Sequence, residues 1–195
     1  ANAFDTFGDT SIVPQMVRTL IANGATNIKG IIIPATGDTA LADTLSASLA
    51  DKSVKVVLLT NNDTDTISVV KDHLVVAESN DMFRYSVFAP SDCSEQSVMI
   101  EFARNINDSR IFVAGQKLTQ NGVEVDPILT ATGLASLIMT QTADPALPMN
   151  GVTIAGFDGI GRTLLEAEMN ALVAGGVTPI YDDGSTIPTV WRLVT

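Results

Sequence analysis

The sequence has few of the residues that most often carry protein chemistry. Its 195 residues include one cysteine, Cys93, and one histidine, His73. A single cysteine excludes an intramolecular disulfide and a metal site made of several thiolates. No apolar run approaches the ~18–20 residues of a membrane-spanning helix, and no basic segment followed by an apolar one marks a signal peptide. We therefore expect a chain that needs neither disulfides nor a membrane span.

Charged residues are also scarce, and most of them are acidic. They make up 17% of the chain against 46% hydrophobic residues, a balance typical of a globular protein. The net charge of −11 repels nucleic-acid phosphates and anionic lipids, which argues against both as partners. It favours contact with basic surfaces. The simpler interpretation, that the acidity only maintains solubility, remains open.

Short β-branched runs alternate with amphipathic stretches, and Gly, Pro, Asn and Asp separate them. We expect strands at 28–34, 54–60, 85–89, 110–115, 152–155, 177–181 and 189–194. Helices are expected at 12–22, around 41–49, and at 65–79, 94–107, 127–140 and 163–174. A loop or hairpin is expected at 121–126, and the last two strands form a hairpin around 182–184.

This alternation predicts an α/β fold, with a mainly parallel sheet and helices on both faces. A small C-terminal α/β or hairpin extension completes it. The strand at 54–60 is apolar nearly throughout, as in strands buried on both faces. The helix after Pro127 is small and apolar all round and is expected to be deeply buried. Thr163 and Glu166 have the spacing of a capping box, with Leu165, Met169 and Leu172 as the apolar stripe behind it. We place a possible division near residue 144, giving domains 1–143 and 144–195 that can also pack as one unit.

Two residues are candidates for nucleophilic or acid–base catalysis. His73 lies in the middle of a predicted helix, and no G-x-S-x-G motif supplies a serine nucleophile for it. Cys93 lies near a predicted helix start, which lowers a thiol pKa, but no basic residue is close in sequence. For both residues a structural role is the simpler interpretation.

Two short motifs resemble ligand-binding loops. Residues 156–163, GFDGIGRT, follow a predicted strand and open a helix, but they match neither G-x-G-x-x-G nor a phosphate loop ending in G-K-[ST]. Asn61, Asp63 and Asp65 have the alternating spacing of a calcium loop without its glycine and glutamate. An ordinary turn and a helix cap explain them more simply. We assign no catalytic, cofactor-binding or metal-binding residue and no cofactor.

Polar turns after the strands, at 34–38, 60–65 and 89–94, leave a second interpretation open. In parallel α/β folds ligands bind at the carboxyl ends of the strands. A flavodoxin-like module or small enzyme would place polar side chains there, although helix caps use the same residue types.

The last third of the chain resembles a known family. Residues 127–138 read PILTATGLASLI, 144–148 read DPALP, 168–178 read EMNALVAGGVT, and 192–195 read RLVT. Their order is similar to that of contractile phage tail sheath proteins, especially the Mu-like group. Residues 12–115 resemble the preceding α/β domain of that family mainly by pattern. Family members carry extended terminal arms, whereas this chain starts at Ala1 and stops at Thr195, so it resembles an armless central and C-terminal fragment.

The resemblance implies a structural subunit and not an enzyme. Sheath subunits assemble around a tail tube above a baseplate, and their arms add strands to the sheets of neighbouring copies. The implied partners are copies of the chain, the tube protein and the baseplate, in a virion tail assembled in the host cytoplasm. Without arms, the isolated chain is expected to be monomeric or weakly associating. A type VI secretion sheath subunit is a further possibility with the same architecture.

Overall fold

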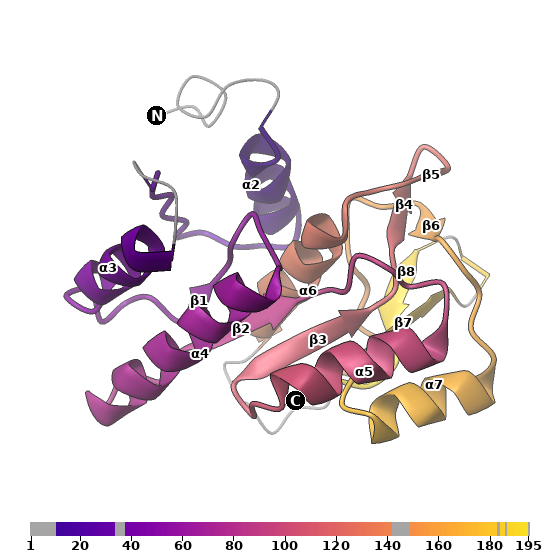
Figure 1. Cartoon of the computed structure of the whole chain (residues 1–195). Helices are drawn as coiled ribbons and strands as arrows, with labels where there is room; N and C mark the ends of the chain where they lie inside the picture. The colour runs from indigo at the N-terminus through magenta and orange to yellow at the C-terminus, as the bar shows by residue number, and fades with distance from the viewer. Residues whose placement is uncertain (1–10, 34–37, 142–148, 183, 186, 195) are drawn as a thin grey trace.

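The computed structural model describes residues 11–33, 38–141, 149–182, 184–185 and 187–194. Its centre is a five-stranded sheet in the order β1-β2-β3-β7-β8 (Figure 1). The first four strands are parallel and β8 is antiparallel to β7. The strands are β1 (Val56–Val57), β2 (Tyr85–Phe88), β3 (Ile111–Gly115), β7 (Thr178–Asp182) and β8 (Pro188–Val190). The expected mixed α/β fold with a mostly parallel sheet is present.

Six helices surround this sheet in the described part of the chain. They are α2 (Val13–Ala22), α3 (Asp38–Ser48), α4 (Thr64–Ser79), α5 (Gln96–Ile106), α6 (Pro127–Gln141) and α7 (Glu166–Ala174). A smaller sheet has the order β5-β4-β6, from β4 (Leu118–Gln120), β5 (Val123–Glu124) and β6 (Gly159–Ile160). None of the described helices is long and apolar enough to cross a membrane.

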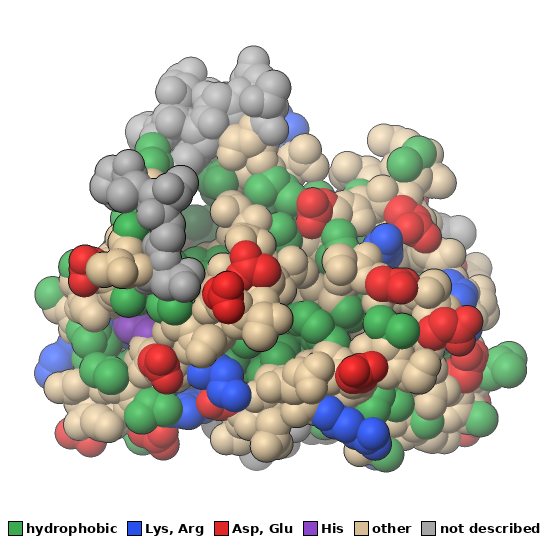
Figure 2. All heavy atoms as spheres, viewed as in Figure 1, with side chains coloured by type: hydrophobic (Ala, Val, Ile, Leu, Met, Phe, Trp, Pro, Cys, Tyr) green, Lys and Arg blue, Asp and Glu red, His purple; other side chains and the backbone are tan. Residues whose placement is uncertain are grey.

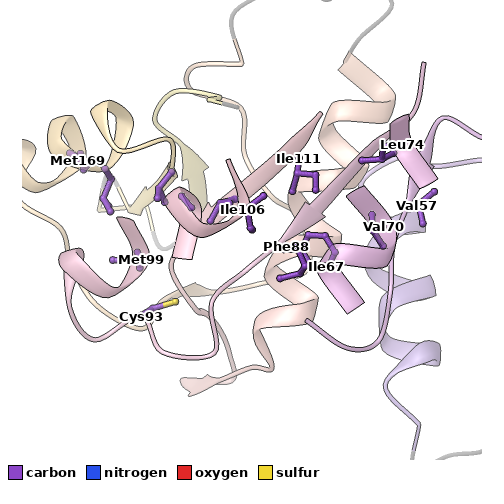
Figure 3. Packing of buried hydrophobic residues seen from close by; sticks show 14 of the residues in the cluster. Val57, Ile67, Val70, Leu74, Phe88, Cys93, Met99, Ile106, Ile111 and Met169 are labelled. Carbon is purple, nitrogen blue, oxygen red and sulfur yellow. The ribbon is translucent and has the colours of Figure 1, made fainter. Parts of the chain in front are cut away.

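The core lies on both sides of the large sheet because alternate residues of a strand point to opposite faces. In β3, Ile111 and Val113 join a cluster with α3, α4, α5 and α7, whereas Phe112 and Ala114 join a cluster with α6. Figure 3 shows the first cluster, in which Ile67 of α4 lies beside Phe88 of the sheet. Burial on both faces explains why β3 is apolar throughout.

Helix α6 confirms the prediction of a deeply buried helix. Every residue from Leu129 to Ile138 is buried, and α2 packs along its outer side (Figure 1). The helix begins as expected, because the Asp126 carboxylate accepts a hydrogen bond from the Ile128 amide at 2.9 Å. The expected stop at residues 144–148 lies outside the described residues.

The hairpin predictions are also confirmed. Asn121 and Gly122 join β4 to β5 with positive φ angles of 55° and 72°, the conformation that a two-residue turn of this kind requires. β7 and β8 form the second antiparallel pair, as predicted around 182–184.

Four expected strands are wrong or too long. The strand expected at 189–194 ends at Val190 in β8. Residues 28–33 form no strand, and Ile31 and Ile32 are exposed. The expected strand at 54–60 shrinks to the two residues of β1, with Val57 buried and its neighbours half-buried; among the described residues β1 pairs only with β2. Residues 152–155 contribute a single bridge between Thr153 and Thr189.

The start of α7 also differs from the prediction. The helix begins at Glu166, so Thr163 lies too early to cap it. Instead, the Glu168 carboxylate accepts a hydrogen bond from the Leu165 amide at 2.8 Å. Leu165 is consequently 70% exposed and leaves the apolar stripe, while Met169 and Leu172 are buried as expected.

Candidate functional site

The carboxyl ends of the parallel strands hold no open set of polar groups in the described residues. Asp63 caps α4 by accepting a hydrogen bond from the Thr66 amide at 2.7 Å, which lowers the pKa of its carboxyl. Asn62 donates to the Ala89 carbonyl and so ties two neighbouring turns together. Asp92 accepts from the Ser94 amide at 2.8 Å. The polar side chains of these turns therefore form hydrogen bonds that cap a helix or join the turns to each other.

His73 is buried and lies beside a second buried basic residue. The residue is 6% exposed, and its Nε2 atom lies 3.0 Å from Nη1 of Arg84, which is 1% exposed. Arginine can only donate, so His73 accepts through Nε2 and is neutral, with its proton on Nδ1. Burial, together with the positive charge of Arg84, lowers the pKa of His73.

Arg84 holds the end of α3 against the start of β2. Its Nη2 donates to the backbone carbonyls of Ser48 and Asp51, both at 2.9 Å, and its Nη1 donates to the Ser48 hydroxyl at 2.8 Å. The carbonyls at a helix C-terminus lack partners within the helix, and a cation there is favourable. His73, Arg84 and Ser48 thus form a structural joint. They are not arranged as a catalytic triad, since Arg84 stands between histidine and serine.

Cys93 is not positioned as a nucleophile. The thiol is 5% exposed, and burial raises its pKa to about 11. Helix α5 starts only at Gln96, so the helix N-terminus does not lower the thiol pKa as considered from the sequence.

The glycine-rich loop at 156–163 is held by hydrogen bonds to the β4–β5 hairpin. Asp158 accepts from the Thr119 hydroxyl at 2.9 Å and from the Gly122 amide at 3.3 Å. Gln120 donates to the Gly156 carbonyl at 3.1 Å. Gly159–Ile160 within this segment form β6, and the next helix starts only at Glu166. A carboxylate at its centre would repel a phosphate.

No group of three or more His, Cys, Asp or Glu side chains in the described ranges could hold a metal ion. Within the Asn61–Asp63–Asp65 spacing, Asp63 caps α4.

A groove lies at the β1 edge of the sheet. It measures about 300 Å³ and lies between residues 27–33, α3 and the residues around β1. Ile31 and Ile33 form one wall, Leu41 and Leu45 another, and 54–59 the floor. The sequence does not indicate this groove, because its pattern predicts a strand at 28–34, whereas the described residues 28–33 form no strand.

The charge around this groove differs from that of the rest of the chain. Residues 27–59 carry three lysines and three aspartates, 3 − 3 = 0, so the whole net charge of −11 lies elsewhere. Lys29 pairs with Asp51, whereas Lys52 and Lys55 form no ion pair with any described residue. Figure 2 shows acidic side chains spread over the viewed face and not gathered in one patch.

No protein-family model and no curated protein matches the sequence. Solved structures do match its fold. The sheath tail protein from Desulfitobacterium hafniense aligns with a TM-score of 0.62 and 9% identity over 80% of this chain and 34% of its own. The sheath tail protein from Listeria innocua aligns with a TM-score of 0.57 and 12% identity, over 85% of this chain and 35% of its own. A chain of the contracted helical sheath of the anti-feeding prophage aligns with a TM-score of 0.62 and 11% identity, over 93% of this chain and 50% of its own.

The chain spans one third to one half of the length of these solved proteins. At such low identity the likeness establishes the fold. The chain thus has the α/β fold found in contractile tail sheath proteins.

Proposed function

We propose that the chain is a body segment of a contractile tail sheath subunit and has no catalytic role. The observation that carries the proposal is the fold. Between 80% and 93% of the chain aligns with sheath proteins of three separate contractile systems, at TM-scores of 0.57 to 0.62. The buried His73 and Cys93 and the self-paired polar turns support it, because a pocket enzyme needs accessible polar groups.

The proposed mechanism stores free energy in the packing of identical bodies. Identical head-to-tail contacts that do not close produce an open ring stack or helix around a tail tube. The bodies then move from an extended to a contracted arrangement of lower free energy, which drives the tube through the host envelope without consuming nucleotide. The proposed partners are other copies, the tube protein and the baseplate, and neither nucleic acid nor membrane is among them.

Electrostatic contacts between subunits are part of the proposed function. A net charge of −11 lets acidic surfaces of one copy meet cationic surfaces of another, or of the tube, when the bodies pack closely. Contacts of this kind weaken with salt, because exposed charges are screened within about 8–10 Å at physiological ionic strength. Assignment to the Mu-like group and assembly in the host cytoplasm belong to the same proposal.

Immunogold electron microscopy tests the function directly. Antibodies raised against the chain are applied to particles released by cells that carry its gene. We expect regular labelling along the tail shaft, over a shorter length in contracted tails. Labelling confined to a capsid or tail fibre would contradict the proposal.

A thermal-shift screen with nucleotides and flavins provides the complementary control. A sheath segment should show no shift with either ligand class, whereas a flavodoxin-like module gains stability that rises with the logarithm of the ligand concentration above Kd. A clear shift that increases with ligand concentration, and that unrelated ligands do not produce, would favour the ligand-binding interpretation over the sheath.

A further inference from the structure

Helix α3 lies at one edge of the chain and is incompletely packed. It contacts mainly α4, at the left of Figure 1. Its buried apolar residues are Leu41 and Leu45, which join the cluster that contains Ile67 and Val70 of α4. The same two leucines also line the groove of about 300 Å³, so part of the inner face of α3 has no packing partner among the described residues. A helix with so few apolar contacts belongs to the elements that open most easily on their own.

The joint around Arg84 ties the C-terminal end of α3 to the rest of the chain. The guanidinium donates to the hydroxyl and carbonyl of Ser48 and to the Asp51 carbonyl, at 2.8 to 2.9 Å. The same Nη1 atom also donates to His73 of α4 at 3.0 Å. Without these bonds, the contacts of Leu41 and Leu45 with α4 would be the main attachment of the helix.

The contact between His73 and Arg84 requires a neutral histidine. Nε2 of His73 accepts a hydrogen bond and therefore carries no proton. A proton on this atom would remove the acceptor and place two cations 3.0 Å apart, with both residues buried. Repulsion between charges is strong where water is excluded, so the protonated pair is unstable in this position.

No carboxylate is available to balance a second cation at the joint. Asp51 is paired with Lys29, and burial together with the charge of Arg84 lowers the pKa of His73. Among the described residues, none of the carboxylates on the surrounding elements forms an ion pair with the imidazole. The charged residues of these elements are Lys71, Asp72 and Glu78 on α4, Asp43 on α3, Asp51, Lys52 and Lys55 after α3, and Asp81 and Arg84 before β2.

We propose that the joint around Arg84 opens in acid, so that protonation of His73 releases α3 and the turn after it from α4 while the rest of the chain stays folded. The proton comes from solvent and binds Nε2, and no covalent bond changes. The proposal concerns a single chain and does not depend on the proposed sheath function, which the immunogold labelling tests separately.

Proton linkage gives the size of the expected effect. In the opened state the imidazole reaches water and regains its ordinary pKa of about 6.5, whereas the closed state holds the pKa of His73 below that value. Opening is therefore nearly independent of pH above 7 and becomes more favourable as the pH falls through this value. One proton that binds only the opened state raises the opening constant about tenfold between pH 7.5 and 5.5.

Native-state hydrogen exchange measures this opening in the full chain. Protection factors, which correct for the intrinsic effect of pH on exchange, are compared for amides of α3 and α5 at pH 7.5 and 5.5 and at several low urea concentrations. We expect α3 to exchange through an opening of its own that exposes little surface and hardly depends on urea. Its protection should fall about tenfold at pH 5.5. Amides of α5 should exchange only when the whole chain unfolds, which urea promotes.

Two variants assign the effect to His73. His73→Gln stays neutral, and its amide oxygen can accept the hydrogen bond from Arg84, so α3 should keep its protection at pH 5.5. Asp72→Asn is the matched control, because Asp72 is an exposed titratable neighbour on the same helix. In this variant α3 should respond to pH as it does in the unmodified chain.

Three outcomes would overturn the proposal. Equal protection and equal urea dependence of α3 and α5 would show that α3 opens only together with the whole chain. Equal protection of α3 at the two pH values in the unmodified chain would show that no proton controls the opening. An undiminished pH response in His73→Gln would assign the control to another group.

Nitrogen NMR provides a second measurement that needs no variant. His73 is the only histidine, so a chain labelled with heavy nitrogen at histidine shows the two ring nitrogens of this residue alone. We expect the proton of the neutral ring on Nδ1 at pH 7.5 and a titration midpoint below the ordinary value of about 6.5. A proton on Nε2, or a midpoint at the ordinary value, would refute the contact with Arg84 on which the proposal rests.

Discussion

Replacing Arg84 with methionine should test whether the buried arginine joint stabilises the fold. Arg84 is 1% exposed and donates to the Ser48 and Asp51 carbonyls, the Ser48 hydroxyl and the His73 ring. No carboxylate contacts it among the described residues. The substitution keeps an apolar stem in the core and removes every one of these donors.

The expected loss follows from the acceptors left behind. A buried acceptor without a partner costs about 1–3 kcal/mol, and Nε2 of His73 becomes such an acceptor. Ser48 and Asp51 are half-buried, so water can partly replace their lost partner. Burying the charge of Arg84 costs desolvation free energy, so removing the charge offsets part of the loss of stability. Together these effects predict that the free energy of unfolding falls by about 2–4 kcal/mol.

Urea unfolding measures this loss. The only tryptophan, Trp191, lies edge-on to Tyr181 with ring centroids 5.3 Å apart, so its fluorescence reports on packing between β7 and the residue after β8. Circular dichroism monitors the helices in parallel, and coincident transitions justify a two-state fit.

Two further variants separate geometry from charge. Arg84→Lys keeps the charge but cannot reproduce the planar fork that reaches both carbonyls, so it should lose nearly as much stability as Arg84→Met. Arg104→Met removes an exposed cation on α5 and should change stability by no more than about 0.5 kcal/mol. If Arg84→Met is as stable as the unmodified chain or more stable, the joint does not stabilise the fold.

Three other predictions follow from buried or closely packed groups. The lowered pKa of His73 means that the unfolded chain binds more protons below pH 6.5, so stability should fall between pH 7 and 5, and less so in His73→Gln, as urea titrations can measure. Gly133→Ala should cost about 1–3 kcal/mol, because a Cβ there lies 2.6 Å from Ile154 Cγ2, and a thermal melt that matches the unmodified chain would contradict this. The Cys93 thiol should react with a disulfide reagent at pH 8 only after unfolding, so rapid labelling of the native chain would disprove its burial.

Local pattern was a sound guide wherever an element depends mainly on its own residues. The buried face of α4, with Ile67, Val70, Leu74 and Ala77, matches the spacing expected for an amphipathic helix. The Asn121-Gly122 turn follows from residues that tolerate positive φ angles. The sequence also indicated the family whose fold the structure shares. The domain division at residue 144 stays a prediction.

The errors fall where a partner distant in sequence decides the outcome. The expected strand at 28–34 failed in this way, because residues 28–33 form no strand in the structure. The start of α7 is a local exception: the Leu165 amide donates to Glu168, the helix begins at Glu166, and the Leu165 side chain is left in solvent. The joint around Arg84 was invisible in the sequence, since Ser48 lies 36 residues away from it.

The sequence by itself determined which segments are helical, which runs are apolar enough for strands, and that few reactive groups exist. Periodicity and turn residues act over a few positions, so they can be recognised along the chain. Only the tertiary structure decided which of the apolar runs pairs with another strand. β3 and residues 28–33 have similar composition, yet β3 is bonded on both sides and 28–33 is left beside a groove. Strand pairing requires that the fold bring a second strand alongside the first. The local sequence pattern of one segment does not indicate whether a second strand lies there.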